Sequence, residues 1–287
     1  MTTVTPALGG LPRQRGPREA APLRKAPAAA LRVNGLRVLR AEWAKFWSLR
    51  SSWTTLLAAF GILAALGLVA AAGHKPTSAM YTPGLGRNAV TIALSGVDFA
   101  QLAFGVLGVL LTAGEYATGT IRSTLSAVPR RLPVLWSKVA VITAIAAGVS
   151  GTSILTAFLG GAGFLHGTGM GLSLGDPGVL RSLLGAVGYL ALVGVLGVAL
   201  GALLRSVAGA VALLIVGVML MRLVIQALPT SLQNLLGPFI PGNAGNSMYS
   251  LHQIPHTLSP GAGAAVLAGW AALALAGAAW RLRRTDV

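Results

Sequence analysis

Residues 53–72 read WTTLLAAFGILAALGLVAAA, twenty residues without a charged side chain. A helix needs about 20 apolar residues to cross the hydrocarbon core of a bilayer, so this stretch predicts a membrane-spanning helix. The stretch runs into AAAG, which superficially resembles a signal-peptidase site. A signal peptide has a shorter apolar core close to the N-terminus, so we expect a retained span rather than a cleaved leader.

The rest of the chain repeats this apolar pattern. Of its 287 residues, 54% are hydrophobic and 10% are charged, whereas a soluble domain carries about 25% charged residues. The chain therefore has too little polar surface to cover itself in water. We predict an all-α polytopic membrane protein whose six-helix transmembrane domain covers 35–284, with spans at 53–72, 92–113, 139–161, 182–204, 207–228 and 262–280.

Two segments precede the first span. Residues 1–34 are rich in Pro, Ala and Arg, a composition that does not support a packed core, so we expect a disordered cytoplasmic tail. Residues 35–50, GLRVLRAEWAKFWSLR, place apolar side chains at helical spacing among charged ones. This pattern predicts an amphipathic helix lying in the membrane interface, with Glu42, Trp43, Lys45 and Trp47 as its characteristic residues. The alternative is that this helix extends the first span into the cytoplasm.

The basic residues predict the orientation. The chain has 22 Lys and Arg against 6 Asp and Glu, a net charge of +16. In a soluble protein this excess would suggest nucleic-acid binding, but here the charges lie in a tail and in short segments between spans. With the N-terminus inside, eighteen of the 22 are cytoplasmic and four are external. The bias of Lys and Arg towards the cytoplasm therefore predicts six helices with both termini cytoplasmic, and no nucleic-acid partner.

Catalytic and metal-binding motifs do not stand out. The sequence has no GxxxxGK[ST] or HExxH pattern and no cysteine, so we expect no enzyme activity, no bound cofactor and no metal. His252 and His256 have metal-like spacing, but Pro255 between them breaks the helix that would align them.

Two charges within the apolar runs are candidate pathway residues, Asp98 and Arg222, because intramembrane charges are usually functional. The alternatives are that Asp98 sits at the outer interface and that Arg222 extends outward to it.

Glycines are frequent in the third and fourth spans, and Gly197 and Gly201 form a GxxxG pair. We interpret them as general bundle packing. The segment 229–261 has no Lys or Arg, as an external loop would, and is expected to contain short helices.

Polar chemistry is concentrated in residues 114–138, GEYATGTIRSTLSAVPRRLPVLWSK, between two apolar runs. This segment resembles the cytoplasmic loop between the second and third spans of bacterial ABC transporter permeases of the ABC type-2 family. The family pattern is matched at Glu115, Gly119, Thr120, Ile121, Arg122, Leu125, Pro129, Arg131 and Lys138. AEWAKFWSLRSSW, residues 41–53, is similar to the E-x-x-K start of the same permeases.

The resemblance implies a function. In that family the loop is a coupling helix that docks into a separate ATPase subunit, which binds ATP and Mg. The resemblance therefore implies a permease subunit of an exporter in the bacterial plasma membrane, paired with a second copy or a related permease. Arg122 would then meet carboxylates on the ATPase, and Arg130, Arg131 and Lys138 would anchor the loop to lipid headgroups. The alternatives are that these charges only set the topology, or that the chain is a gradient-driven carrier or channel without an ATPase.

Overall fold

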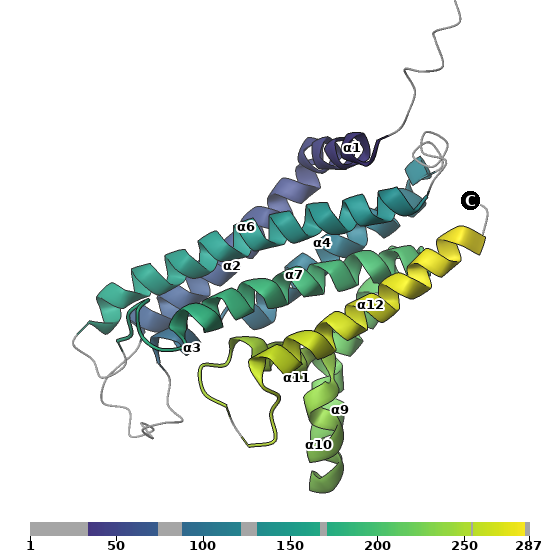
Figure 1. Cartoon of the computed structure of the whole chain (residues 1–287). Coiled ribbons are helices and arrows are strands. Elements are labelled where there is room, and N and C mark those ends of the chain that lie inside the picture. Colours follow the sequence, from purple (N-terminus) through teal and green to yellow (C-terminus); the bar gives the residue numbers. More distant parts are fainter. Residues whose placement is uncertain (1–33, 74–87, 122–130, 167–170, 254, 285–287) are drawn as a thin grey trace, which may run out of the picture. The chain divides into compact units, whose positions relative to one another are not determined.

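The computed structural model describes residues 34–73, 88–121, 131–166, 171–253 and 255–284 (Figure 1). Within these ranges every regular element is a helix. The tail expected at the N-terminus lies outside them, apart from Asn34. The helix α1 (Gly35–Ser48) then begins the described chain, where the amphipathic pattern placed a helix.

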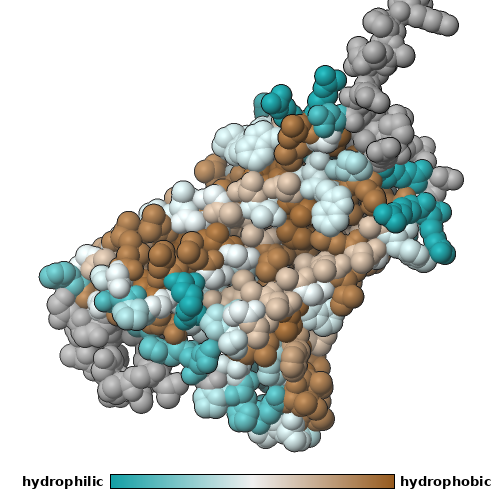
Figure 2. All heavy atoms as spheres, viewed as in Figure 1, coloured by the Kyte–Doolittle hydropathy of each residue, from teal (hydrophilic) through white to brown (hydrophobic). Residues whose placement is uncertain are grey.

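Six helices in the described residues are long and apolar enough to cross a membrane. They are α2 (Arg50–Ala72), α4 (Val97–Ala117), α6 (Leu132–Leu165), α7 (Val179–Leu204), the continuous α8–η2–α9 (Val207–Ile215, Val216–Leu220, Met221–Gln226) and α12 (Pro260–Arg284). The predicted fold class is confirmed, and the chain is an integral, multi-span membrane protein. Hydrophobic side chains cover much of the face shown in Figure 2, and hydrophilic ones gather towards its ends.

Local sequence explains where two of the long helices begin. The second span was expected from 92, but the short helix α3 (Ala89–Ala93), capped by Asn88, comes first, and α4 begins at Val97 after the turn at 94–96. The helix α6 starts at Leu132 with Pro133 in its first turn, where the missing N–H of proline is tolerated. The earlier start of α6 places Lys138 inside a helix rather than at its beginning.

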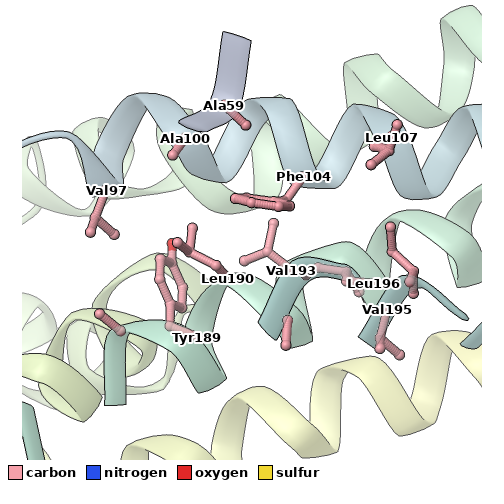
Figure 3. Packing of buried hydrophobic residues seen from close by; sticks show 14 of the residues in the cluster. Ala59, Val97, Ala100, Phe104, Leu107, Tyr189, Leu190, Val193, Val195 and Leu196 are labelled. Atoms are coloured by element: carbon pink, nitrogen blue, oxygen red, sulfur yellow. The ribbon is translucent and has the colours of Figure 1, made fainter. Parts of the chain in front are cut away.

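The centre of the bundle is the pair α4 and α7, and Phe104 of α4 faces Val193 of α7 (Figure 3). Their backbones meet through reciprocal glycines. A Cβ on Gly197 would lie 2.1 Å from the carbonyl oxygen of Gly105, and one on Gly108 would lie 2.1 Å from that of Gly194. Small residues allow such close approach in membranes. Gly197, which was expected to serve helix packing, therefore packs against the backbone of α4 at Gly105.

The chain between the fifth and sixth spans forms α10 (Thr230–Leu236), η3 (Gly237–Phe239) and α11 (Pro241–Tyr249), so the expected short helices are present. The helix α11 packs against both α7 and α12. A Cβ on Gly185 of α7 would lie 2.1 Å from the carbonyl oxygen of Met248, and one on Gly263 of α12 would lie 2.4 Å from that of Ala244. Glycines on both long helices therefore make the space that α11 occupies.

The two ends of the bundle hold different elements, and we call them the α1 end and the α11 end. The α1 end holds α1, residues 118–121 and 131, and the arginine-rich end of α12. The α11 end holds α3, α10 and α11, together with the first turns of α4 and α7.

Candidate functional site

Four charged side chains from three helices form a buried ion network at the α1 end. Lys138 of α6 places its Nζ 2.6 Å from Glu42 Oε2 of α1 and 3.0 Å from the carbonyl oxygen of Leu111 of α4, and it also donates to Glu115 Oε1 of α4. Lys45 Nζ of α1 lies 2.6 Å from the same Glu115 oxygen. The network of Glu42, Lys45, Glu115 and Lys138 therefore ties α1 to the helices on both sides of the loop.

The charges of this network balance. Two carboxylates face two ammonium groups, and the side chain of Lys138 is only 2% exposed. A buried ammonium group needs acceptors for all three of its protons, and Glu42, Glu115 and the Leu111 carbonyl supply three. Burial of an isolated charge is costly, so this full pairing is what allows Lys138 to lie inside an apolar bundle.

Helical spacing delivers Glu42 to the network. Val38, Glu42 and Phe46 are buried, and residues four apart share one face of a helix. Phe46 is one of the apolar residues that recur at helical spacing in 35–50, but two others, Leu36 and Trp43, are 63% and 42% exposed. The face of α1 that meets the bundle therefore includes only part of the apolar stripe, and it also carries a carboxylate.

Glu115 is held in place by its partners rather than by its helix. It lies in the last turn of α4, which ends at Ala117, and the negative end of the helix dipole disfavours a carboxylate there. Its Oε1 accepts from both lysines, whereas its buried Oε2 has no hydrogen-bond partner among the described residues. Two cations thus offset an unfavourable helix position.

The expectation that Lys138 anchors the loop to lipid headgroups is wrong, because Lys138 is enclosed by protein. Arg131 donates from Nη1 to the carbonyl oxygen of Leu282 at 3.0 Å, so one of its contacts joins the loop to the end of α12. Arg281 of α12 in turn donates to the carbonyl oxygen of Leu203 at the end of α7. Arginines here satisfy free carbonyls at helix C-termini.

Other residues of the loop motif are only partly described. Gly119 has a positive φ of 72°, which glycine adopts without steric cost, and it ends α4 with Thr118. The hydroxyl oxygens of Thr118 and Thr120 lie 2.9 Å apart. Arg122, Leu125, Pro129 and Arg130 lie outside the described residues.

Aromatic side chains join α1 to the start of the first span. The Trp47 ring centroid lies 5.7 Å from that of Trp43 and 4.5 Å from that of Trp53, and Trp53 Nε1 donates to the Trp47 carbonyl at 3.1 Å. Leu49 separates α1 from α2 with an extended backbone. The amphipathic segment is thus a separate helix rather than a direct extension of the first span.

The two candidate pathway charges meet each other at the α11 end. Arg222 Nη1 of α9 lies 3.3 Å from Asp98 Oδ1 of α4, and Arg222 also donates to the carbonyl oxygen of Gly242. The Asp98 side chain is 56% exposed, which fits an interface position better than a buried one. Burial raises the pKa of the neighbouring Tyr249. The negative charge of Asp98 raises this pKa further, and the positive charge of Arg222 lowers it.

A chain of hydrogen bonds continues from this pair into the core. Gln101 Nε2 donates to the Asp98 carbonyl at 2.7 Å, and the Tyr189 hydroxyl of α7 donates to Gln101 Oε1. Gln101 and Tyr189 were not predicted from the sequence. A glutamine three residues after Asp98, on the same face of an apolar helix, was the available signal.

The comparisons with known proteins do not identify a family. No protein-family model matches the chain, and no curated protein is significantly similar to it. The function is therefore inferred from the residues and their geometry.

Proposed function

We propose that this chain is the membrane-spanning permease subunit of an ATP-driven exporter of the ABC type. It would form the translocation pathway and couple to a separate ATPase subunit, which binds ATP and Mg. The chain itself would catalyse no reaction, and it would work in the bacterial plasma membrane with both termini in the cytoplasm. A second copy or a related permease would complete the pathway.

The observation that carries this proposal is the joining of the two sequence motifs. Glu42 and Lys45 come from the segment similar to the permease N-terminal motif, and Glu115 and Lys138 come from the segment similar to the coupling loop. The shared ion network brings the two segments into contact. The resemblance places these residues in two separate motifs, and the ion network links the two motifs by direct contacts.

The network also suggests how coupling would work. A partner that pushes on the loop between α4 and α6 would act on both helices, because Glu115 lies in the last turn of α4 and Lys138 lies near the start of α6. Lys138 and Lys45 connect this region to α1, so α1 would move with it. Rigid-body rocking of packed helices is a common way to switch conformations.

Co-purification tests the proposal. A tagged chain would be isolated from native membranes in mild detergent, in parallel with the variant Arg122→Glu. The matched control is Arg40→Glu, the same change at an exposed position of α1. We expect a P-loop ATPase with the wild type and the control, and much less of it with Arg122→Glu at equal membrane insertion. Failure of any ATPase to co-purify with the wild type would refute the proposal.

The alternative is a gradient-driven carrier or channel. The Asp98–Arg222 pair supports it, because it links the second and fifth spans at one end of the bundle. Transport by the purified chain in vesicles that contain no ATPase would favour this alternative.

A further inference from the structure

A polar pocket of about 290 Å³ lies at the α11 end, and the segment between the fifth and sixth spans builds most of it. This volume is near the lower limit of sites that hold small molecules. Eleven of its sixteen described lining residues have polar side chains, in a protein that is otherwise largely apolar.

Part of the lining is held firmly. The Arg222 guanidinium is fixed by the Gly242 carbonyl and by Asp98. Gln233 Nε2 donates to the carbonyl oxygens of Gln226 and Leu228 at 3.0 and 2.7 Å. Asn243 Nδ2 donates to the Gly237 carbonyl at 2.9 Å. These contacts set the positions of the walls before any ligand binds, which lowers the cost of ordering on binding.

Other lining groups have hydrogen-bonding capacity left. Within the described part of the chain, the side-chain amides of Gln226, Asn234 and Asn246 make no hydrogen bond. His252 and His256 add two imidazoles to the same lining, and the strained φ of 64° at His256 shows that the loop is bent there. As expected from Pro255, the described residues around the two histidines are not helical. The bend nevertheless brings both histidines into the lining of one pocket.

The charge of the lining is positive. Among the described lining residues Arg222 is the permanently charged one, and none is a carboxylate. Its partner Asp98 lies outside the lining, is more than half exposed, and is 3.3 Å away, so water weakens that pair. The Arg222 Nε is buried and has no hydrogen-bond partner within the part of the chain that the structure describes. A guanidinium surrounded by amide and imidazole donors suits an oxyanion.

We infer that this pocket binds a small hydroxylated phosphate ester. The phosphate would interact with Arg222 and the imidazoles, and the hydroxyl groups would bond to the amides of Gln226, Asn234 and Asn246. A carboxylate alone has fewer acceptor oxygens than the donors around this pocket. The same chemistry occurs in a free glycerol phosphate and in the headgroup of phosphatidylglycerol. This inference does not depend on the proposed ATPase partner.

Titration calorimetry of the full chain in phosphatidylcholine nanodiscs tests it, with glycerol 3-phosphate as the probe and glycerol as the negative control. The key variant is Asn234→Asp, which adds a negative charge to the pocket at an exposed position. Its matched control is Ser231→Asp, which adds the same charge to α10 at an exposed residue that does not line the pocket. Arg222→Gln would be a second variant, but it also removes the Gly242 contact.

We expect saturable binding to the wild type, affinity reduced about tenfold or more by Asn234→Asp, and a change of less than about twofold with Ser231→Asp. A second arm measures co-purification of phosphatidylglycerol from mixed nanodiscs. Asn234-dependent retention of this lipid without binding of glycerol 3-phosphate would support the site and identify the headgroup as the source. No binding in either arm, or binding that Asn234→Asp leaves unchanged, would overturn the inference.

Discussion

Replacement of Lys138 by methionine gives the sharpest test of the buried network. Methionine has a similar length and fits an apolar surround, so the change removes the charge with little loss of volume. Glu42 and Glu115 then lose a shared partner, and the side chains of both are less than a tenth exposed. The cluster changes from neutral to a net charge of −1, and Glu42 keeps no cation within the described residues.

The expected cost follows from this geometry. Removal of one partner from a buried ion pair costs about 3–5 kcal/mol, because the other charge stays buried and unpaired. For a domain of this size, 1 kcal/mol shifts the apparent melting temperature by roughly 2–4 °C. Lys138→Met should therefore melt on the order of 10 °C lower than the wild type. Lys45→Met should cost about 1 kcal/mol or less, because Lys45 is 34% exposed and Glu115 keeps Lys138.

The assay is a thermal scan of intrinsic tryptophan fluorescence in mild detergent, since Trp43, Trp47 and Trp53 lie next to the network. The double variant Lys138→Met/Glu42→Gln restores neutrality by leaving the Lys45–Glu115 pair. Residues that share a network couple by about 0.5–3 kcal/mol, so the double variant should melt higher than Lys138→Met alone. A Lys138→Met melting temperature within about 2 °C of the wild type, or strictly additive effects of the two changes, would refute the reasoning.

Two further predictions concern packing and orientation. A Cβ on Gly245 would lie 2.0 Å from the Tyr189 ring, so Gly245→Ala should lower the melting temperature by several degrees, on the scale of an overpacking cost of about 1–3 kcal/mol. Gly261→Ala, where a Cβ meets nothing within 4 Å, should not. The chain has no native cysteine, so single cysteines can report sidedness in whole cells. A membrane-impermeant maleimide should label Ser231→Cys and should label Arg283→Cys only after the cells are opened; the reverse pattern would contradict the predicted topology.

The six long helices could be predicted because the signal for a span lies along the chain itself. Length and hydropathy of a run such as 53–72 suffice for it. The limits of a helix were harder, because local chemistry sets them. The capping box of Asn88 starts a separate short helix before α4, and Pro133 lies in the first turn of an α6 that begins early enough to include Lys138. The spans predicted at 182–204 and 207–228 leave only Arg205 and Ser206 between them, and there Ser206 caps the next helix.

The ion network could not be predicted because it depends on which helices are neighbours. Glu42 and Lys138 are 96 residues apart, and single-sequence patterns carry no information on such pairs. On α1, the apolar stripe indicated a face that includes Phe46, but the buried face also includes Glu42. A signal was nevertheless present. In a chain with only six Asp and Glu residues, Glu42 shares a segment with Lys45 and Glu115 shares one with Lys138, both next to predicted spans, and buried charges must be paired.

The helix α4 connects the two sites described above. Asp98 lies in its first turn and Glu115 in its last, and at 1.5 Å per residue the two are separated by about 26 Å. Between them, the glycine contacts of Gly105 and Gly108 hold α4 directly against the backbone of α7. Such a pair bends little, because a core without voids transmits displacement instead of absorbing it. A displacement of the loop after α4 would therefore move Asp98 and change its contact with Arg222. This contact helps to position Arg222 in the wall of the polar pocket. If the chain is a permease, a movement started by a partner at the α1 end would change ligand affinity at the α11 end.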